Sequence, residues 1–157
     1  MDVLIYAAAG PAGGERTLAY HLLALALERE YGLDSLPEIA REPGGKPFFP
    51  SRPDICFSIS HSHGAAVCAL HDQPVGVDIE KLRHAPQRLA KGMEDGAFFR
   101  LWTAKEATVK RRGEGLEALL GPLELDPRCQ CLEDLLEGYL ITVCPSEEAA
   151  VRTMRIE

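Results

Sequence analysis

Two carboxylates stand two residues apart in the segment VGVDIE, residues 75–80. Read as a β-strand, this segment turns its three β-branched residues toward one face and Asp78 and Glu80 toward the other. By strand rise alone the two acids lie about 7 Å apart, and like charges that close repel unless a cation lies between them. The segment therefore predicts a cation-binding strand.

A third acid and a base are spaced to share one face of a helix. Trp102, Glu106 and Lys110 follow at four-residue intervals in GAFFRLWTAKEATVKRRGEG, which reads as a helix that ends at Gly113. A lone Glu–Lys pair at this spacing is usually a surface ion pair. Beside the strand acids, however, Glu106 makes a third carboxylate, and such a set suits Mg2+ better than zinc.

Two further segments carry groups that suit phosphate. In GGKP, residues 44–47, two glycines permit close backbone approach, Lys46 brings a positive charge and Pro47 stiffens the loop. In FSISHSHG, serines that include Ser60 alternate with other residues, and His61 lies beside them, so hydroxyls and imidazoles can bind phosphate oxygens. Either segment alone is typical of an ordinary turn, and GGKP is not a Walker loop. Together with the acids, they indicate a magnesium–diphosphate ligand.

Hydrophobic periodicity and turn residues predict the elements that must position these groups. The order is strand, helix, strands, then helix, strands, which indicates an α+β fold built from two similar halves. The second helix should have Asp95 as its N-cap. The expected strands are 3–8, 55–60, 65–70, 75–80, a weak one at 128–133, 139–144 and 149–156, and the expected helices are 15–32 and 96–113.

Composition excludes two classes of partner. The chain of 157 residues is 46% hydrophobic, which suffices for a core, and its net charge of -7 argues against binding to nucleic acid or anionic membrane. No apolar run is long enough to span a bilayer, and MDVLIYAAAG reads as a buried first strand rather than a signal peptide.

The five cysteines favour reduced thiols over a disulfide framework. Their number is odd, and Cys56, Cys68 and Cys144 lie in apolar, strand-like runs. We therefore expect buried thiols in a cytoplasmic protein. Cys129 and Cys131 could form half of a metal site, but no second Cys/His pair lies near them in the sequence.

Positive charge gathers in one part of this acidic chain. Residues 81–112 hold nine basic and three acidic side chains, so this segment is near +6 while the rest is near -13. Such a run is usually a solvated helical face. Its alternative role is a landing area for an acidic ligand or partner.

Four motifs together resemble the 4'-phosphopantetheinyl transferase superfamily, in particular the pseudo-twofold type that activates peptide and polyketide synthases. They are GGKPFFP, ICFSISHSHG, VGVDIE and FFRLWTAKEATVKRRGEGL, which occur in the family's order between Gly45 and Leu116. GERTLAYHLL is similar to the family's first helix, where an arginine, here Arg16, reaches coenzyme A phosphates. The resemblance implies two halves related by a pseudo-twofold axis, residues 1–80 and 81–157, each a helix on a small, mostly antiparallel sheet.

The resemblance also implies a reaction. A serine of an apo acyl or peptidyl carrier protein attacks the β-phosphate of coenzyme A, and 3',5'-ADP leaves. Such carriers present an acidic helix beside that serine, and we expect a monomeric enzyme. The implied metal ligands for Mg2+ are Asp78, Glu80 and Glu106.

The remaining residues take roles by the same resemblance. Glu106 is the candidate base, and Lys110 stabilises or protonates the leaving phosphate. The other implied coenzyme-binding residues are Lys46, Pro47, Ser60, His61, Arg16 and Lys105, and Trp102 supports Glu106 from the core.

Two alternatives remain open. One is a relative that binds coenzyme A or a carrier without catalysis, and the other is a different Mg2+-dependent nucleotide enzyme. The segment between Glu80 and Trp102, and the chain before the first helix, are shorter than is usual in the family. The carrier and its pathway cannot be read from the sequence.

Overall fold

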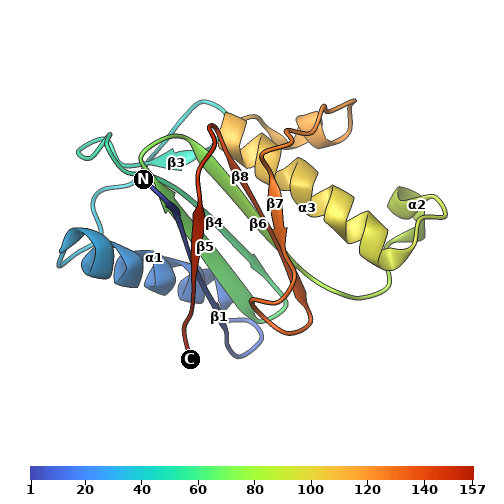
Figure 1. Cartoon of the computed structure of the whole chain (residues 1–157), viewed down its shortest axis with the longest axis horizontal. Coiled ribbons are helices and arrows are strands. Elements are labelled where there is room, and N and C mark those ends of the chain that lie inside the picture. The colour runs from blue at the N-terminus through green and yellow to red at the C-terminus, as the bar shows by residue number, and fades with distance from the viewer.

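The computed structural model describes residues 1–157, with the side chain of Leu116 left aside. Figure 1 shows its helices and strands in chain order. The elements are β1 (Val3–Ala9), α1 (Glu15–Tyr31), β2 (Ala40–Arg41), β3 (Pro47–Phe48), β4 (Cys56–Ser62), β5 (Ala65–His71), β6 (Val75–Lys81), α2 (Gln87–Ala90), α3 (Asp95–Arg112), the 3-10 helix η1 (Leu116–Leu119), β7 (Gln130–Leu132), β8 (Tyr139–Pro145) and β9 (Val151–Arg155).

Two sheets form the centre of the molecule, and each carries one long helix. The first has the order β4-β5-β1-β9 and the second has the order β6-β8-β7, while β2 and β3 form a separate small pair. All pairs are antiparallel except β1 with β9. The helix α1 packs on the first sheet and α3 packs on the second (Figure 1). The predicted α+β class, with a helix on each small, mostly antiparallel sheet, is confirmed.

Strands from both ends of the chain meet in each sheet. The strand β6, which runs through residue 80, pairs with β8, and the C-terminal β9 pairs with the N-terminal β1. Each sheet therefore holds a strand from the other end of the chain. The pseudo-twofold relation between two halves stays a prediction.

Burial of apolar side chains explains why these segments form helices and strands that pack together. One face of α1 packs with Tyr6, Phe49 and Phe57 in a first core, and the β-branched residues of β6 belong to a second core between the sheets. Gly32 and Gly113 end the two long helices in the left-handed conformation, as their positions predict. The second of these caps sets where α3 ends, beside the loop of residues 42–46.

The predicted start of α3 is wrong by one residue. Glu94 is its N-cap, and Asp95 is its first helical residue. The carboxylate of Asp95 instead accepts a hydrogen bond from the backbone N–H of Ala85 at 2.8 Å and contacts His84 at 3.1 Å. Asp95 therefore anchors the preceding loop to the helix.

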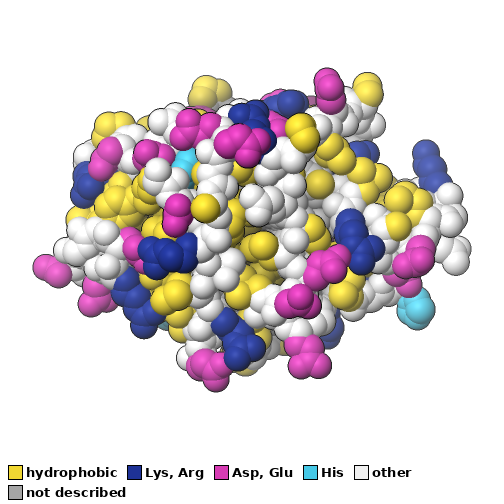
Figure 2. Space-filling view, in the orientation of Figure 1, with side chains coloured by type: hydrophobic (Ala, Val, Ile, Leu, Met, Phe, Trp, Pro, Cys, Tyr) yellow, Lys and Arg dark blue, Asp and Glu magenta, His cyan; other side chains and the backbone are white. Residues whose placement is uncertain are grey.

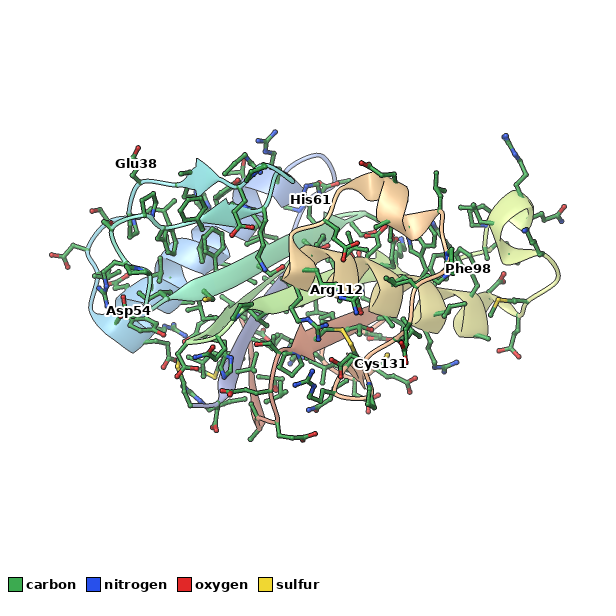
Figure 3. The ribbon with its side chains drawn as sticks, turned by 90° about the horizontal axis from the view of Figure 1, so that it is seen from above. Glu38, Asp54, His61, Phe98, Arg112 and Cys131 are labelled. Atoms are coloured by element: carbon green, nitrogen blue, oxygen red, sulfur yellow. A yellow bond between two sulfur atoms is a disulfide. The ribbon has the colours of Figure 1, made fainter. Side chains whose placement is uncertain are left out.

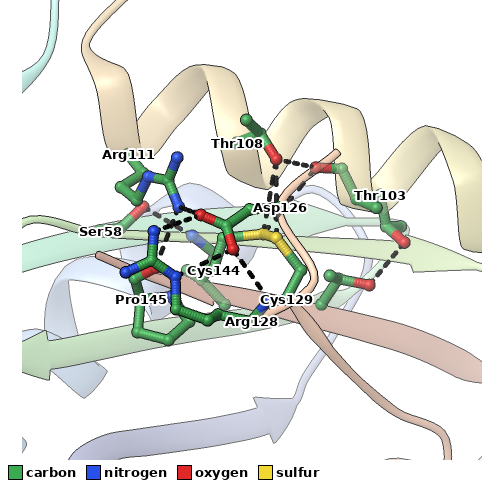
Figure 4. Close-up of a disulfide and its surroundings, with 12 residues drawn as sticks. Ser58, Thr103, Thr108, Arg111, Asp126, Arg128, Cys129, Cys144 and Pro145 are labelled. Carbon is green, nitrogen blue, oxygen red and sulfur yellow. Dashed lines mark hydrogen bonds and ion pairs between the residues drawn. A yellow bond between two sulfur atoms is a disulfide. The ribbon is translucent and has the colours of Figure 1, made fainter. Parts of the chain in front are cut away.

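The expectation that all cysteines are free thiols is also wrong. Cys129 and Cys144 form a disulfide beneath α3, where Thr108 contacts both sulfurs at 3.6 Å (Figure 4). Cys129 directly precedes β7, which pairs with β8, so the two cysteines face each other across neighbouring strands. Cys131 is exposed and free, and a half metal site at Cys129 is thereby excluded.

Serine hydroxyls join the two sheets along β4 and β6. The backbone N–H groups of Val77, Ile79 and Lys81 donate to the hydroxyls of Ser58, Ser60 and Ser62, at 3.1, 3.2 and 3.3 Å. The constant offset of 19 residues means that the two strands run in parallel. We call these three contacts the serine ladder. They satisfy edge N–H groups of β6 that a backbone partner would otherwise have to satisfy.

Gly76 lets α3 lie directly on β6. A Cβ atom at this position would lie 1.9 Å from the carbonyl oxygen of Ala107 and 2.6 Å from the backbone nitrogen of Arg111. Both contacts are with helix backbone, so a side chain there can be accommodated only if the helix moves. The glycine thus fixes the distance between the acids of β6 and the polar face of α3.

We predict that Gly76→Ala lowers the free energy of unfolding by about 1–3 kcal/mol, because overpacking displaces α3 from β6. Urea denaturation measures this change. Gly121→Ala is the matched control, since its Cβ would meet nothing within 4 Å, and it should change stability by less than about 1 kcal/mol. Equal stability of the two variants would contradict the close approach.

Candidate functional site

Three carboxylates converge where β6 meets α3. Asp78 and Glu80 lie on β6, Glu106 lies on α3, and a ligand oxygen from each falls within 4.8 Å of the others. The predicted alternation of the strand and the spacing of the helix thus bring the acids together. Oxygen donors in this number suit a hard divalent cation.

Basic side chains and serines hold one oxygen of each strand acid. Lys110 donates to Oδ1 of Asp78 at 3.2 Å, and Ser60 donates to the same atom at 3.0 Å. Oε2 of Glu80 accepts from Arg83 at 3.0 Å and from Ser62 at 3.3 Å. Arg83 also lies 4.7 Å over the ring of Phe99. These partners disperse part of the negative charge.

Asp78 is the acid most strongly affected by its surroundings. Its side chain is 2% exposed, and Oδ2 is buried without a hydrogen-bond partner among the described residues. Burial raises its pKa well above the usual value, nearby Glu106 and Glu80 raise it further, and Lys110 opposes them. A buried, unpartnered carboxylate oxygen beside two other acids is the atom that a metal ion would satisfy.

The acids open onto a cleft that also holds basic groups. The acid end of this cleft has a volume of about 300 Å3, and Arg16, Arg41, His61 and Lys110 line it with the three carboxylates. In Figure 3 His61 lies between the side that carries α1 and the side that carries α3. The alternation of β4 turns His61 away from the serine ladder and toward α1, whose first turn carries Arg16. Cations and acids therefore face one space.

Sequence reasoning missed two members of this cleft. Arg41, on the short strand β2, and Tyr20, on α1, line both the acid end and its continuation toward the loop at residues 44–47. The continuation adds about 300 Å3 and includes Pro47. Arg41 precedes the GGKP loop by only three residues, but no local pattern shows that its side chain lines the cleft, which depends on the pairing of β2 with β3.

Lys46 lies deep in this region, and two acceptors engage its amine. Nζ donates to the carbonyl oxygens of Arg111 at 2.8 Å and Val75 at 3.2 Å. Burial lowers its pKa. These contacts join the end of α3 to the start of β6, so Lys46 has a structural role, and its phosphate contact stays a prediction.

The remaining predicted residues also differ in whether they are engaged inside the protein or line the cleft. Ser60 is buried, and its hydroxyl is used by Asp78 and by the N–H of Ile79. Trp102 stacks on Phe98 with ring centroids 5.8 Å apart, in the core cluster below the acid face of α3. Lys105 lies outside the set of described residues that line the cleft.

A second group with metal-ligand chemistry lies outside the cleft. It consists of His71, Asp72 and Glu147. Nε2 of His71 already contacts the carbonyl oxygen of Met1 at 3.0 Å and Asp72 at 3.3 Å. Two of its three members are exposed. The acids of β6 and α3 are therefore the better candidate for a metal site.

The raised pKa of Asp78 makes a prediction about stability. In the unfolded state the pKa of an aspartate is about 3.9. A carboxyl whose pKa is higher than this in the folded state binds its proton more tightly when the protein is folded. Its contribution to stability therefore falls as the pH rises from about 3.9 to the pKa of the folded state. Asp78→Asn removes this titration. In EDTA, the variant should gain stability relative to the wild type between pH 4 and neutral pH.

Urea unfolding of both proteins across this pH range measures the difference, in which the titration of acids remote from Asp78 cancels. Glu137→Gln, at an exposed acid outside the cleft, is the control and should follow the wild type. A pH-independent difference between Asp78→Asn and the wild type would contradict the raised pKa.

Comparison with known proteins relates the chain to one family. Residues 74–149 match the family model described as the 4'-phosphopantetheinyl transferase superfamily. The chain is 33% identical over 151 residues to a 4'-phosphopantetheinyl transferase of Bacillus subtilis, covering 84% of this chain and 64% of the relative. It is 32% identical to 4'-phosphopantetheinyl transferase Sfp of Bacillus subtilis (strain 168), covering 60% of this chain and 50% of the relative.

A third relative extends the range of organisms. The chain is 34% identical to 4'-phosphopantetheinyl transferase AcpT of Salmonella typhimurium (strain LT2), and the match covers 52% of each chain. The chain thus spans between half and about two thirds of the length of these relatives. Both β6 and α3, with all three acids, lie inside the segment that matches this family model, and over that segment the chain resembles the 4'-phosphopantetheinyl transferase superfamily.

Proposed function

We propose that this protein transfers 4'-phosphopantetheine from coenzyme A to a serine of an apo acyl or peptidyl carrier protein, with Mg2+ as cofactor. The observation that carries the proposal is the buried, unpartnered Oδ2 of Asp78 within the group of three acids. The acids share their cleft with arginine, lysine and histidine side chains, which suits a ligand that carries several phosphates. The family and its relatives' names point to the same reaction.

The acids and bases of the cleft divide the work of transfer. Asp78, Glu80 and Glu106 would hold Mg2+, which when bound neutralises charge on the diphosphate. The hydroxyl oxygen of the carrier serine forms a bond to the β-phosphorus, and Glu106 accepts the proton that this hydroxyl loses. The bond from that phosphorus to the oxygen of the departing 3',5'-ADP breaks, and Lys110 stabilises the negative charge that this oxygen gains. Positioning and charge neutralisation supply most of the catalysis.

No helix among the described parts of the chain is both long enough and apolar enough to cross a membrane. We place the enzyme in the cytoplasm, where its co-substrate and an apo carrier would meet it, and we keep the expectation that it acts as a monomer.

The first functional prediction is metal-dependent modification of a carrier. With coenzyme A and Mg2+, the wild type should increase the mass of an apo carrier by one phosphopantetheine group. Asp78→Ala and Glu106→Ala should lower the rate by about 100-fold or more, because they remove a metal ligand or the base. Glu80→Ala should lower the rate less if water replaces one ligand.

Mass spectrometry of the carrier reads out this reaction, and Glu137→Ala is the control at an exposed acid. A wild type that binds coenzyme A but never modifies a carrier would favour the non-catalytic alternative. Coenzyme turnover without carrier modification would favour a different nucleotide enzyme. Full transfer in excess EDTA would contradict the metal.

The second functional prediction concerns the 3'-phosphate of coenzyme A. We propose that His61 and Arg16 bind this phosphate, because they lie opposite the acids, whereas Lys46 is engaged with backbone carbonyls. His61→Ala and Arg16→Ala should each raise the KM for coenzyme A by about tenfold, the effect of losing one charge-assisted hydrogen bond. Lys46→Ala should instead lower thermal stability.

Dephospho-coenzyme A, which lacks that phosphate, separates these roles. The wild type should prefer coenzyme A strongly, and the His61 and Arg16 variants should prefer it much less. His21→Ala, at an exposed histidine of α1 outside the acid end of the cleft, should keep the wild-type preference. Undiminished preference in both cleft variants would place the 3'-phosphate elsewhere.

The segment between β6 and α3 is the proposed docking surface for the carrier. It projects at the end of the molecule around α2 (Figure 1). Arg88 and Lys91 are exposed on it, and Leu89 and Met93 are 46% and 39% exposed beside them. Figure 2 shows hydrophobic side chains at the surface of this projecting end. A surface of basic and apolar groups suits the acidic helix of a carrier.

We predict that Arg88→Glu and Lys91→Glu raise the KM for the carrier several-fold while leaving the KM for coenzyme A unchanged. Moderate salt should raise the carrier KM of the wild type as well, since exposed charges are screened beyond about 8–10 Å. Arg155→Glu, on the distant β9, is the control. Arg83 is unsuitable for this test because it pairs with Glu80. A carrier KM that ignores both charge and salt would remove this surface from consideration.

A further inference from the structure

The serine ladder does more than join two sheets. All three serines accept a hydrogen bond from an N–H of β6, but two of them also donate to a carboxylate of the cleft. Ser60 donates to Asp78 and Ser62 donates to Glu80. Nδ1 of His63 also lies 2.9 Å from the Ser62 hydroxyl, to which it donates when that nitrogen carries the ring proton. Ser58 has the first kind of contact without the second among the described residues.

The donors follow one pattern at both acids. Each strand acid receives one serine and one basic side chain, and both donate to the same oxygen. At Asp78 this leaves Oδ2 buried and without a partner within the described structure, and at Glu80 it engages Oε2. A carboxylate held by one oxygen cannot rotate freely, so its second oxygen keeps a fixed direction.

We infer that Ser60 and Ser62 are positioning residues that present Asp78 and Glu80 to a divalent cation through one oxygen each. This inference rests on the proposed function, since it assumes that the three acids hold a metal. One-oxygen carboxylates in a rigid set suit Mg2+ or Mn2+, which demand a regular octahedron, whereas Ca2+ accepts carboxylates through both oxygens in a looser set. The two serines therefore contribute both affinity and choice of ion.

The test measures binding of Mn2+ and of Ca2+ to the whole protein without coenzyme A or carrier, by titration calorimetry and by electron paramagnetic resonance of free Mn2+. Ser60→Ala and Ser62→Ala should weaken Mn2+ binding by about tenfold, as loss of an outer partner of a metal ligand does. Their Ca2+ affinity should fall less, so the Mn2+/Ca2+ ratio drops. Ser62→Thr, which keeps the hydroxyl, should restore the ratio.

Ser58→Ala is the matched control, because it removes the same kind of contact with a β6 N–H but no bond to a carboxylate. It should leave the Mn2+/Ca2+ ratio unchanged, even if it lowers the melting temperature. The inference is overturned if Ser58→Ala lowers the ratio as much as the other two, or if the ratio is insensitive to all three. If Ser60→Ala does not fold, the Ser62 variants decide the matter, since Ser62 is slightly more exposed, at 9% against 6% for Ser60.

Failure of the proposed function looks different. A wild type whose Mn2+ binding depends on these serines, but that modifies no carrier, would contradict the transferase assignment and support the positioning role. The wild type could instead modify a carrier with Mg2+ while the Ser60 and Ser62 variants bind Mn2+ and Ca2+ like Ser58→Ala. This result would contradict only the positioning role. A wild type that binds no Mn2+ at millimolar concentration would overturn the inference itself.

Discussion

The structure depends on how the free edge of β6 is satisfied. One edge of this strand pairs with β8, and its other N–H groups point at β4, which already pairs with β5. Serine hydroxyls close this edge without merging the sheets into one. The sheets therefore meet at a seam, and a polar cleft can open along it because side chains rather than backbone cross the junction.

The same seam keeps three acids close together, which is unfavourable without counter-charge. Rigid packing holds them there: Gly76 lets α3 touch β6, and the hydroxyls of Thr103 and Thr142 meet at 2.7 Å between α3 and β8. Lys110 and Arg83 supply counter-charge on the same side as the serines. The fold thus holds mutually repelling carboxylates close together, and a bound cation would reduce their repulsion. This is expected of a site shaped for function rather than for stability.

Local patterns were sufficient to predict the acids, and long-range pairing decided the rest. Strand alternation put Asp78 and Glu80 on one face, and helix spacing put Glu106 and Lys110 on another, since both depend only on neighbours in the sequence. The contacts of Lys46 and Ser60 with β6 and the end of α3 could not be predicted, because nothing local shows that their polar atoms meet these elements. The disulfide was missed for the same reason: it depends on the register of β7 and β8.

The seam also explains why the proposed phosphate-binding and metal-binding groups come largely from different sheets. Arg16, Arg41 and His61 lie on α1, β2 and β4, while the three acids, together with Lys110, lie on β6 and α3. A ligand that carries a diphosphate and a separate phosphate would span this boundary if each engaged its own set of groups. Any change that shifts one sheet relative to the other would alter the distance between the proposed phosphate-binding residues and the proposed metal site, even if no residue of either set were changed. The serine ladder is thus the mechanical link between binding and chemistry.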